Sequence, residues 1–169
     1  VPRRPPEHYH GEWYSYFHDT FESDWPGYWV LDDSPTWGVT TYRSAEGYQS
    51  VWCAGSEYQP GGGYLNNMNA WMIDGPFDLS NTTDARLYFD YYLHTEPEYD
   101  SLYVGLSTDG ETFDGNVYSG DSDGWVLDES FDGFDYENQL YFMIVNGLTG
   151  FHSLASETQQ RIDITFDFG

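Results

Sequence analysis

The sequence predicts an all-β sandwich, and three observations lead to this prediction. Aromatic residues make up 20% of the 169 residues, and such residues favour strands and supply large buried surfaces. Short apolar segments recur, separated by Gly, Pro, Asn and Asp at intervals of about ten residues, as a sandwich requires. No segment shows a sustained helical period. The length fits one domain with a substantial core.

The first 15 residues are expected to lie outside the sandwich, which then occupies residues 16–169. Three prolines among the first six residues oppose helices and sheet ladders, and they favour an extended arm. Trp13 ends this arm as a large apolar contact residue. We therefore expect an arm that is available to contact another surface.

Period-two alternation and turn residues place the expected strands along the rest of the chain. These strands are residues 17–22, 28–31, 38–43, 50–54, 69–73, 86–94, 102–107, 112–119, 125–131, 139–145 and 161–168. The strands 86–94 and 102–107 are expected to pair with each other through the acidic turn 95–100. In the first of them, Leu87, Phe89, Tyr91 and Leu93 are expected to face the core.

Charge narrows the range of partners. The formal net charge is −24, with 29 acidic residues and five basic ones, all of which are Arg. Phosphate binding needs clustered cations, so nucleic acid and anionic membrane surfaces are excluded as partners. No window of about 18 apolar residues is present, so no membrane insertion is expected. Divalent cations and neutral sugars fit this charge better, although an acidic shell also serves solubility or high-salt adaptation.

A single cysteine, Cys53, excludes a disulfide within the chain. It lies in the short apolar run 50–54, which favours a buried and unreactive thiol.

Several short motifs together resemble a known family. They are Phe21-Glu22, Trp25-Pro26-Gly27-Tyr28-Trp29, Trp37-Gly38, Tyr42-Arg43-Ser44, Ser50-Val51-Trp52-Cys53-Ala54-Gly55, Asn66-Asn67-Met68, Gly75-Pro76-Phe77-Asp78-Leu79-Ser80, Thr95-Glu96, Tyr99-Asp100 and Ser107-Thr108-Asp109-Gly110. This pattern resembles the MAM-like jelly-roll modules of secreted bacterial proteins. Those modules include the accessory domain of immune-inhibitor-A-type metallopeptidases and the choice-of-anchor surface modules. The resemblance implies an antiparallel two-sheet jelly roll that is extracellular, non-catalytic and often stabilised by calcium.

The resemblance also implies a pair of calcium ligands. In such modules an acidic residue after the first strand and an Asp in the last strand share the cation, and these correspond to Glu22 and Asp163. Family members usually close with two adjacent Asp residues, whereas this chain has only Asp163 at that place.

Other acidic clusters are candidate calcium sites on their own chemistry, because calcium takes six to eight oxygen ligands. Glu96 and Asp100, together with Glu98, gather on one turn, and Asp109, Glu111 and Asp114 gather on another. The segment 121–124 has part of an EF-hand loop, but the first and twelfth positions do not fit. A solvated acidic turn is the alternative for each cluster.

No catalytic motif is present, neither HExxH nor GxSxG, so we expect no enzyme. Tyr88 and Tyr92 alternate with the core residues of their strand and are expected to face outward, as are Tyr103 and Tyr141. Such tyrosines form a flat amphipathic surface that stacks on sugar rings or is covered by another subunit. The alternative is that part of the same chain covers them.

Two functions follow from these features. The first is an extracellular structural protein whose subunits assemble on a surface or in a filament, with the N-terminal arm adding to a neighbour's sheet. The second is a carbohydrate-binding or adhesion module of a secreted protein. The sequence favours self-association, because a lone accessory module has no catalytic partner here. Asn81 begins an N-x-[ST] sequon, which predicts a glycosylation site.

Overall fold

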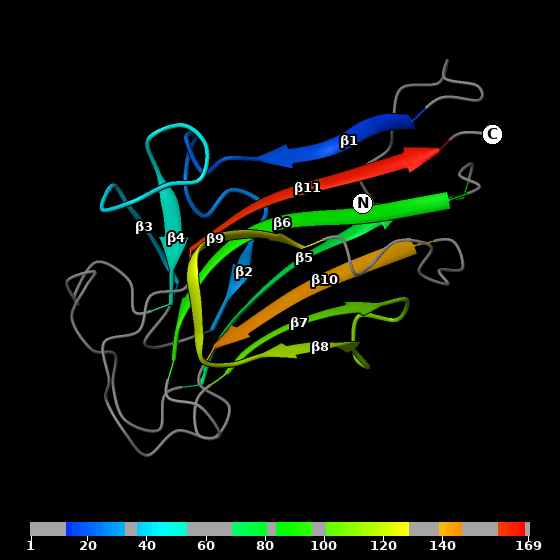
Figure 1. Cartoon of the computed structure of the whole chain (residues 1–169). Helices are drawn as coiled ribbons and strands as arrows, with labels where there is room; N and C mark the ends of the chain where they lie inside the picture. The colour runs from blue at the N-terminus through cyan, green and yellow to red at the C-terminus, as the bar shows by residue number, and fades with distance from the viewer. Residues whose placement is uncertain are drawn as a thin grey trace.

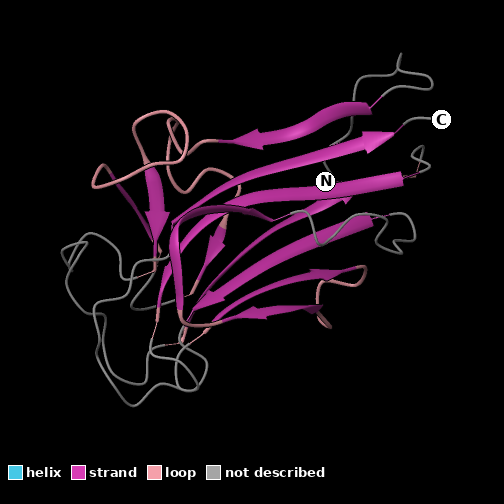
Figure 2. Cartoon of the chain, in the orientation of Figure 1, coloured by secondary structure: helices cyan, strands magenta, loops and turns pink. Residues whose placement is uncertain are grey.

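The computed structural model describes residues 13–32, 37–53, 69–80, 84–95, 101–128, 139–146 and 159–167. Within these ranges the chain consists of strands, turns and loops (Figure 2). The same residues contain no helix that is long and apolar enough to cross a membrane. The all-β prediction is therefore confirmed.

The strands follow the chain in the order β1 to β11. Their bounds are β1 (Trp13–Asp19), β2 (Val30–Leu31), β3 (Gly38–Thr40), β4 (Ser50–Trp52), β5 (Ala70–Asp78), β6 (Asp84–His94), β7 (Leu102–Ser107), β8 (Asp114–Tyr118), β9 (Asp121–Asp128), β10 (Gln139–Asn146) and β11 (Gln159–Asp167). Most of the expected strands are present, and they differ from the prediction mainly in the residues at which each strand begins and ends.

Two antiparallel sheets form the layers of the sandwich (Figure 1). One is a four-stranded sheet in the order β1-β11-β6-β9, and the other is a five-stranded sheet in the order β2-β5-β10-β7-β8. A separate two-stranded sheet pairs β3 with β4. Strands from distant parts of the sequence thus lie next to each other in both sheets.

The core lies between the two main sheets. Phe89 and Leu87 from β6 belong to the same buried cluster as Phe142 from β10 and Val104 from β7. Aromatic contacts join the layers: the ring centroids of Phe17 and Phe77 are 5.5 Å apart, and those of Tyr91 and Tyr118 are 5.0 Å apart. These tilted ring pairs add to the stabilisation that burial alone provides.

The predicted faces of β6 are confirmed, but its predicted partner is wrong. Leu87, Phe89 and Leu93 are buried, and Tyr91 packs against the core. However, β6 pairs with β11 and β9, whereas β7 pairs with β10 and β8 in the other sheet. The chain therefore passes from one sheet to the other between β6 and β7, and these two strands do not form a hairpin.

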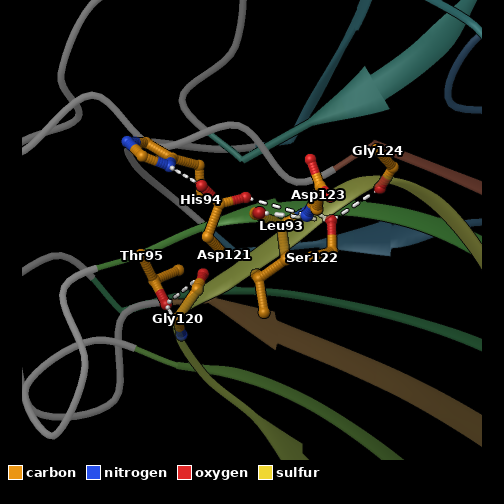
Figure 3. Close-up of polar contacts among 8 residues, drawn as sticks. All are labelled: Leu93, His94, Thr95, Gly120, Asp121, Ser122, Asp123 and Gly124. Carbon is orange, nitrogen blue, oxygen red and sulfur yellow. Dashed lines mark hydrogen bonds and ion pairs between the residues drawn. The ribbon is translucent and has the colours of Figure 1, made fainter.

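A buried corner explains this crossing (Figure 3). The chain leaves the four-stranded sheet after β6 at Thr95, and it returns to that sheet from β8 at Gly120. The Gly120 N–H donates to Thr95 Oγ1 at 2.7 Å, and the Thr95 N–H donates to the Gly120 carbonyl at 2.9 Å. Both residues are buried, so each bond also satisfies a polar group that water does not reach.

Ser122 extends the corner into the β6–β9 ladder. Its Oγ accepts the Leu93 N–H at 2.9 Å and donates to the Gly124 carbonyl at 2.6 Å (Figure 3). Next to it, Nδ1 of His94 lies 3.4 Å from Oδ2 of Asp121. A shift of register between Tyr92 and His94 occurs at this point. Segment 121–124, which has part of an EF-hand motif, is thus the beginning of β9.

The first strand begins earlier than predicted. Residues 13–15, which were assigned to the arm, form the start of β1 and pair with residues 165–167 of β11 in the same chain. The strand ends at Asp19 because Phe21 takes a left-handed conformation with φ of 61°. Oδ1 of Asp19 accepts the Phe21 N–H at 2.7 Å and holds this turn. Residues 1–12 lie outside the described residues.

The small β3–β4 sheet closes one end of the core. Trp37 and Trp52 are fully buried there, and Nε1 of Trp37 donates to the Ala70 carbonyl at 3.1 Å. Cys53, which follows β4, has an exposed fraction of 0%. The predicted buried thiol is confirmed.

The corner leads to a first prediction. Thr95→Val keeps the shape of the side chain but removes a buried acceptor, and it leaves the Gly120 N–H without its partner. We expect the free energy of unfolding to fall by about 1 to 3 kcal/mol in urea denaturation. Thr20→Val is the matched control, because the hydroxyl of half-buried Thr20 makes no hydrogen bond to a described residue. Equal stability of the two variants would contradict the role given to the corner.

Candidate functional site

The outer face of the five-stranded sheet carries a continuous apolar and aromatic surface. Because directly paired residues of an antiparallel ladder share a face, the registers place the members of this surface side by side. We refer to it as the tyrosine face, and its members are Val30, Trp71, Ile73, Tyr103, Gly105, Val117, Tyr141 and Met143. None of these residues carries a charge, and Val30 and Val117 are exposed.

Tyr103 lies flat on this face. It stands between the buried residues Leu102 and Val104, so its side chain points away from the core. A Cβ placed on Gly105 would lie 2.6 Å from Cε1 of the Tyr103 ring, which shows that the ring passes directly over the glycine. The Tyr103 hydroxyl donates to the Phe113 carbonyl at 2.9 Å and fixes the far end of the ring. The half-buried ring thus rests on the backbone of Gly105.

The ionisation of Tyr103 agrees with this position. Burial raises the pKa of its hydroxyl, and the nearby carboxylate of Asp114 raises it further. The hydroxyl therefore stays protonated at neutral pH and remains a donor to Phe113. A neutral ring held by one hydrogen bond is a stable surface for stacking.

Tyr141 has the same arrangement on the neighbouring strand. It stands between buried Leu140 and Phe142, and it pairs with Ser107 of β7. A Cβ on Gly110 would lie 3.0 to 3.1 Å from three atoms of its ring, and a Cβ on Gly75 would also meet the ring at 3.0 Å. Both glycines also have positive φ, at 77° and 134°. A larger residue is therefore disfavoured there by its backbone conformation as well as by contact with the ring. This ring too is supported by backbone.

The two rings form a short track along the sheet. Ser107, which is opposite Tyr141, is four residues after Tyr103 on β7, a distance of about 13 Å at about 3.3 Å per residue. The Tyr103 ring extends over Gly105, which reduces the gap between the rings. The track is long enough for a ligand with more than one ring.

Polar groups surround the Tyr141 end of the tyrosine face. Oδ1 of Asp109 accepts the backbone N–H groups of Glu111 and Thr112, each at 2.8 Å, and the Ser107 hydroxyl at 2.8 Å. These bonds, led by that from Thr112, lower the pKa of Asp109 to about 2. Nε2 of Gln139 donates to the Thr108 carbonyl at 2.9 Å. The predicted calcium cluster 109–114 is thus a turn ordered by its own hydrogen bonds.

The four predicted contact tyrosines are divided between the two sheets, and their role in ligand contact stays a prediction. Tyr88 and Tyr92 belong to β6 and point outward from the four-stranded sheet, on the opposite side of the sandwich from Tyr103 and Tyr141. The period-two pattern places each ring outside the core, but it carries no information about which sheet a strand joins.

Tyr92 is moreover covered by other side chains. The Arg43 guanidinium carbon lies 3.8 Å from the centroid of its ring, and Trp125 meets it edge-on at 5.9 Å. Arg43 also lies 4.9 Å from the Tyr42 ring. These contacts hold the loop 41–49 against the four-stranded sheet, which is a structural use of Tyr92.

Glu22, a predicted calcium ligand, holds the same loop from the other side. Its Oε1 accepts the N–H groups of Tyr48 and Gln49 at 2.6 and 2.7 Å. Glu96 and Asp100 lie outside the described residues, as does the side chain of Asp163, whose backbone pairs with His18 and Tyr88. Where the chain is described, no three His, Cys, Asp or Glu side chains are close enough to hold a metal ion. Calcium binding stays a prediction.

Two further predicted residues have little structural description. Trp13 is the first residue of β1 and pairs with Asp167, and its side chain is outside the description. Asn81 lies in the segment 81–83, also outside it. Sequence reasoning missed the glycines that support the tyrosine face, although the Tyr-x-Gly spacing of residues 103 and 105 was visible.

Comparison with known proteins gives similarity at the level of the fold. No protein-family model matches the chain, and no curated protein sequence is significantly similar. The structure is similar to TmCBM61 in complex with beta-1,4-galactotriose, with a TM-score of 0.54 and 10% identity over 82% of this chain and 86% of that one. It is also similar to the xylan-binding domain from CBM 22, with a TM-score of 0.56 and 12% identity over 92% and 96%.

A third similar structure is an adhesin. The K1 cleaved adhesin domain of Lys-gingipain from Porphyromonas gingivalis W83 has a TM-score of 0.54 and 14% identity, over 93% of this chain and 98% of that one. At these identities the comparisons establish a shared β-sandwich fold. They also show that the chain has the size of one such module.

The pKa of Asp109 leads to a second prediction. Because its folded pKa of about 2 is below its ordinary value of 3.8, the ionised carboxylate stabilises the fold above about pH 4. This contribution is lost as the pH falls through 2. Asp109→Asn should therefore lower the melting temperature at pH 7, and the difference from wild type should shrink toward pH 2. A difference that does not change with pH would contradict this assignment.

Calcium is tested by a third prediction. If a cation binds the acidic chain, it stabilises the native state by mass action. The melting temperature should then be several degrees higher in millimolar calcium than in EDTA, and Mg²⁺ at the same concentration is the control for ionic strength. Superimposable melting curves would remove calcium from consideration.

Proposed function

We propose that this chain is a non-catalytic carbohydrate-binding module that holds a neutral glycan against the tyrosine face. The observation that carries the proposal is the pair of rings, Tyr103 and Tyr141, each of which is half-buried on the outer side of its strand and lies against glycine. Sugar rings present flat apolar C–H faces, and aromatic rings offer the matching surface together with a polar edge. Rings that are already fixed lose little side-chain entropy on binding.

The fold is in keeping with this proposal. Two of the similar structures are described as a xylan-binding domain and as a complex with galactotriose. Both descriptions agree with the carbohydrate-binding function considered from the sequence, and neither concerns the filament subunit that was the other function considered. The adhesin domain fits a related role in attachment.

Charge selects the type of glycan. The net charge of −24 and the carboxylates of Asp109 and Asp114 near the tyrosine face repel sulfated or uronic-acid polymers. A neutral polysaccharide meets no such repulsion. An extracellular location is part of this proposal.

Assembly into a filament has less support. Residues 13–15 of the predicted arm are paired within their own chain, and the remaining arm is outside the described residues. Self-association and the finer resemblance to MAM-like modules stay predictions. Size-exclusion chromatography of the intact chain tests the first of them.

The fourth prediction tests the tyrosine face directly. In affinity electrophoresis or calorimetry with soluble xylan and galactan, Tyr141→Ala or Tyr103→Ala should weaken binding at least tenfold, about 1.4 kcal/mol. Tyr88→Ala, on the opposite sheet, is the matched control and should bind like wild type. Polygalacturonate should not bind to any of them.

The same measurements distinguish a glycan site on the tyrosine face from one on the four-stranded sheet. If Tyr88→Ala loses binding and Tyr141→Ala does not, the glycan lies on the four-stranded sheet. If the wild type binds no neutral polysaccharide, the proposal is wrong.

The role of the glycine support has a fifth prediction. Gly105→Ala places a methyl group against the Tyr103 ring, which must lift and lose its bond to Phe113. Because the ring is the part that moves, glycan affinity should fall while the melting temperature changes little. Tyr103→Phe, which keeps the ring on the glycine but lacks the hydroxyl, should keep more affinity than Gly105→Ala. The reverse order would contradict the stacking model.

A further inference from the structure

A cavity lies in the segment that leads from β1 in one sheet to β2 in the other, and its lining does not include Tyr103 or Tyr141. Its volume is about 330 Å³, within the range of small-molecule sites. The lining side chains that matter here are Phe21, Trp25, Tyr28, Trp29, Asp19 and Asp24. All of the described residues that line the cavity come from residues 17–29.

The aromatic walls stand at angles to one another. The rings of Phe21 and Trp25 are 5.8 Å apart with an interplanar angle of 69°, and those of Phe21 and Trp29 are 6.4 Å apart at 40°. Tyr28 is at the rim and is 70% exposed. Phe21 and Trp29 are buried and contact each other, so the ring surface that a ligand can reach belongs to half-buried Trp25 and exposed Tyr28.

Asp19 fixes these walls in place. Its Oδ1 accepts the Phe21 N–H at 2.7 Å, and its Oδ2 accepts Nε1 of Trp29 at 3.0 Å. Trp29 is buried and packs edge-on against Phe142 of the core, with ring centroids 5.5 Å apart. The cavity is therefore built on a rigid base and needs little rearrangement to bind a ligand.

The electrostatic field of the cavity is negative. Asp19 and Asp24 are part of its lining, and both donors to Asp19 are neutral groups that leave its charge in place. The described residues that line the cavity include no Arg or Lys, and Nε2 of His18 in this lining lies 3.6 Å from a carboxylate oxygen of Glu46. The net charge of −24 adds a long-range attraction for cations.

We propose that this cavity binds a small organic cation with a quaternary ammonium head. Such a cation is attracted to ring faces within about 6 Å of their centroids and needs no hydrogen-bond acceptor. A primary ammonium is a compact and more strongly hydrated charge, so it loses more hydration than a quaternary one on entering an aromatic site. The rings of Trp25 and Tyr28 and the nearby carboxylates of Asp19 and Asp24 together favour the quaternary head. This site is separate from the proposed glycan site.

The test compares choline with a neutral molecule of the same shape. Choline chloride is titrated into the intact chain, with tryptophan fluorescence and calorimetry as readouts, and sodium chloride at equal concentration is the salt control. The neutral isostere is 3,3-dimethylbutan-1-ol, in which carbon replaces the nitrogen. We expect saturable binding of choline and at least tenfold weaker binding of the alcohol.

Two exposed tyrosines provide matched variants. Tyr28→Ala removes a wall of the cavity and should weaken choline binding at least fivefold. Tyr48→Ala, which changes an exposed tyrosine outside the lining, should bind choline like the wild type. Asp24→Asn removes one lining charge and should weaken choline binding while leaving the binding of the alcohol unchanged.

Each result decides for or against the proposal. Equal affinity for choline and the alcohol would make the cavity a general apolar site and overturn the cation proposal, as would the absence of saturable choline binding. Tyr141→Ala should leave choline affinity intact, so the loss of glycan binding and the loss of cation binding can be told apart.

Discussion

The paired hydrogen bonds between Thr95 and Gly120 are the constraint on which the arrangement of the sheets depends. The chain passes this corner twice, once on leaving the four-stranded sheet and once on returning to it. Between these two points, β7 and β8 are available to the five-stranded sheet. The corner therefore assigns Tyr103 to one side of the sandwich and Tyr92 to the other. This assignment decides which side chains lie on the outer face of each sheet.

The strands and their buried faces could be predicted from the sequence, because alternation and turn residues act locally. The strand 139–146 differs from its predicted bounds by one residue, and the inward faces of Leu87 and Phe89 were read from periodicity alone. The partners of each strand could not be predicted in this way. An acidic turn with proline after His94 is compatible with a hairpin and with a crossing, and only long-range packing decides between them.

The candidate binding faces were predictable to the same extent. Outward tyrosines could be identified one by one, but their grouping depends on which sheet each strand joins. The support of Tyr141 by Gly75 and Gly110 joins residues far apart in the sequence, so no local pattern reveals it. The role of Glu22 was hidden for the same reason, since its partners at residues 48 and 49 belong to another loop. The aromatic and acidic residues of the segment 17–29 were visible, whereas their enclosure of a cavity was not.

The burial of Cys53 determines whether copies of the protein can form disulfides with each other under oxidising conditions. A thiol with no exposed surface cannot reach a second thiol while the chain is folded, so native copies cannot be cross-linked through it. Any covalent dimer must then come from molecules that have opened at the β4 end of the core. In a stored sample, the fraction of disulfide-linked dimers thus measures how often the β4 end of the core has opened.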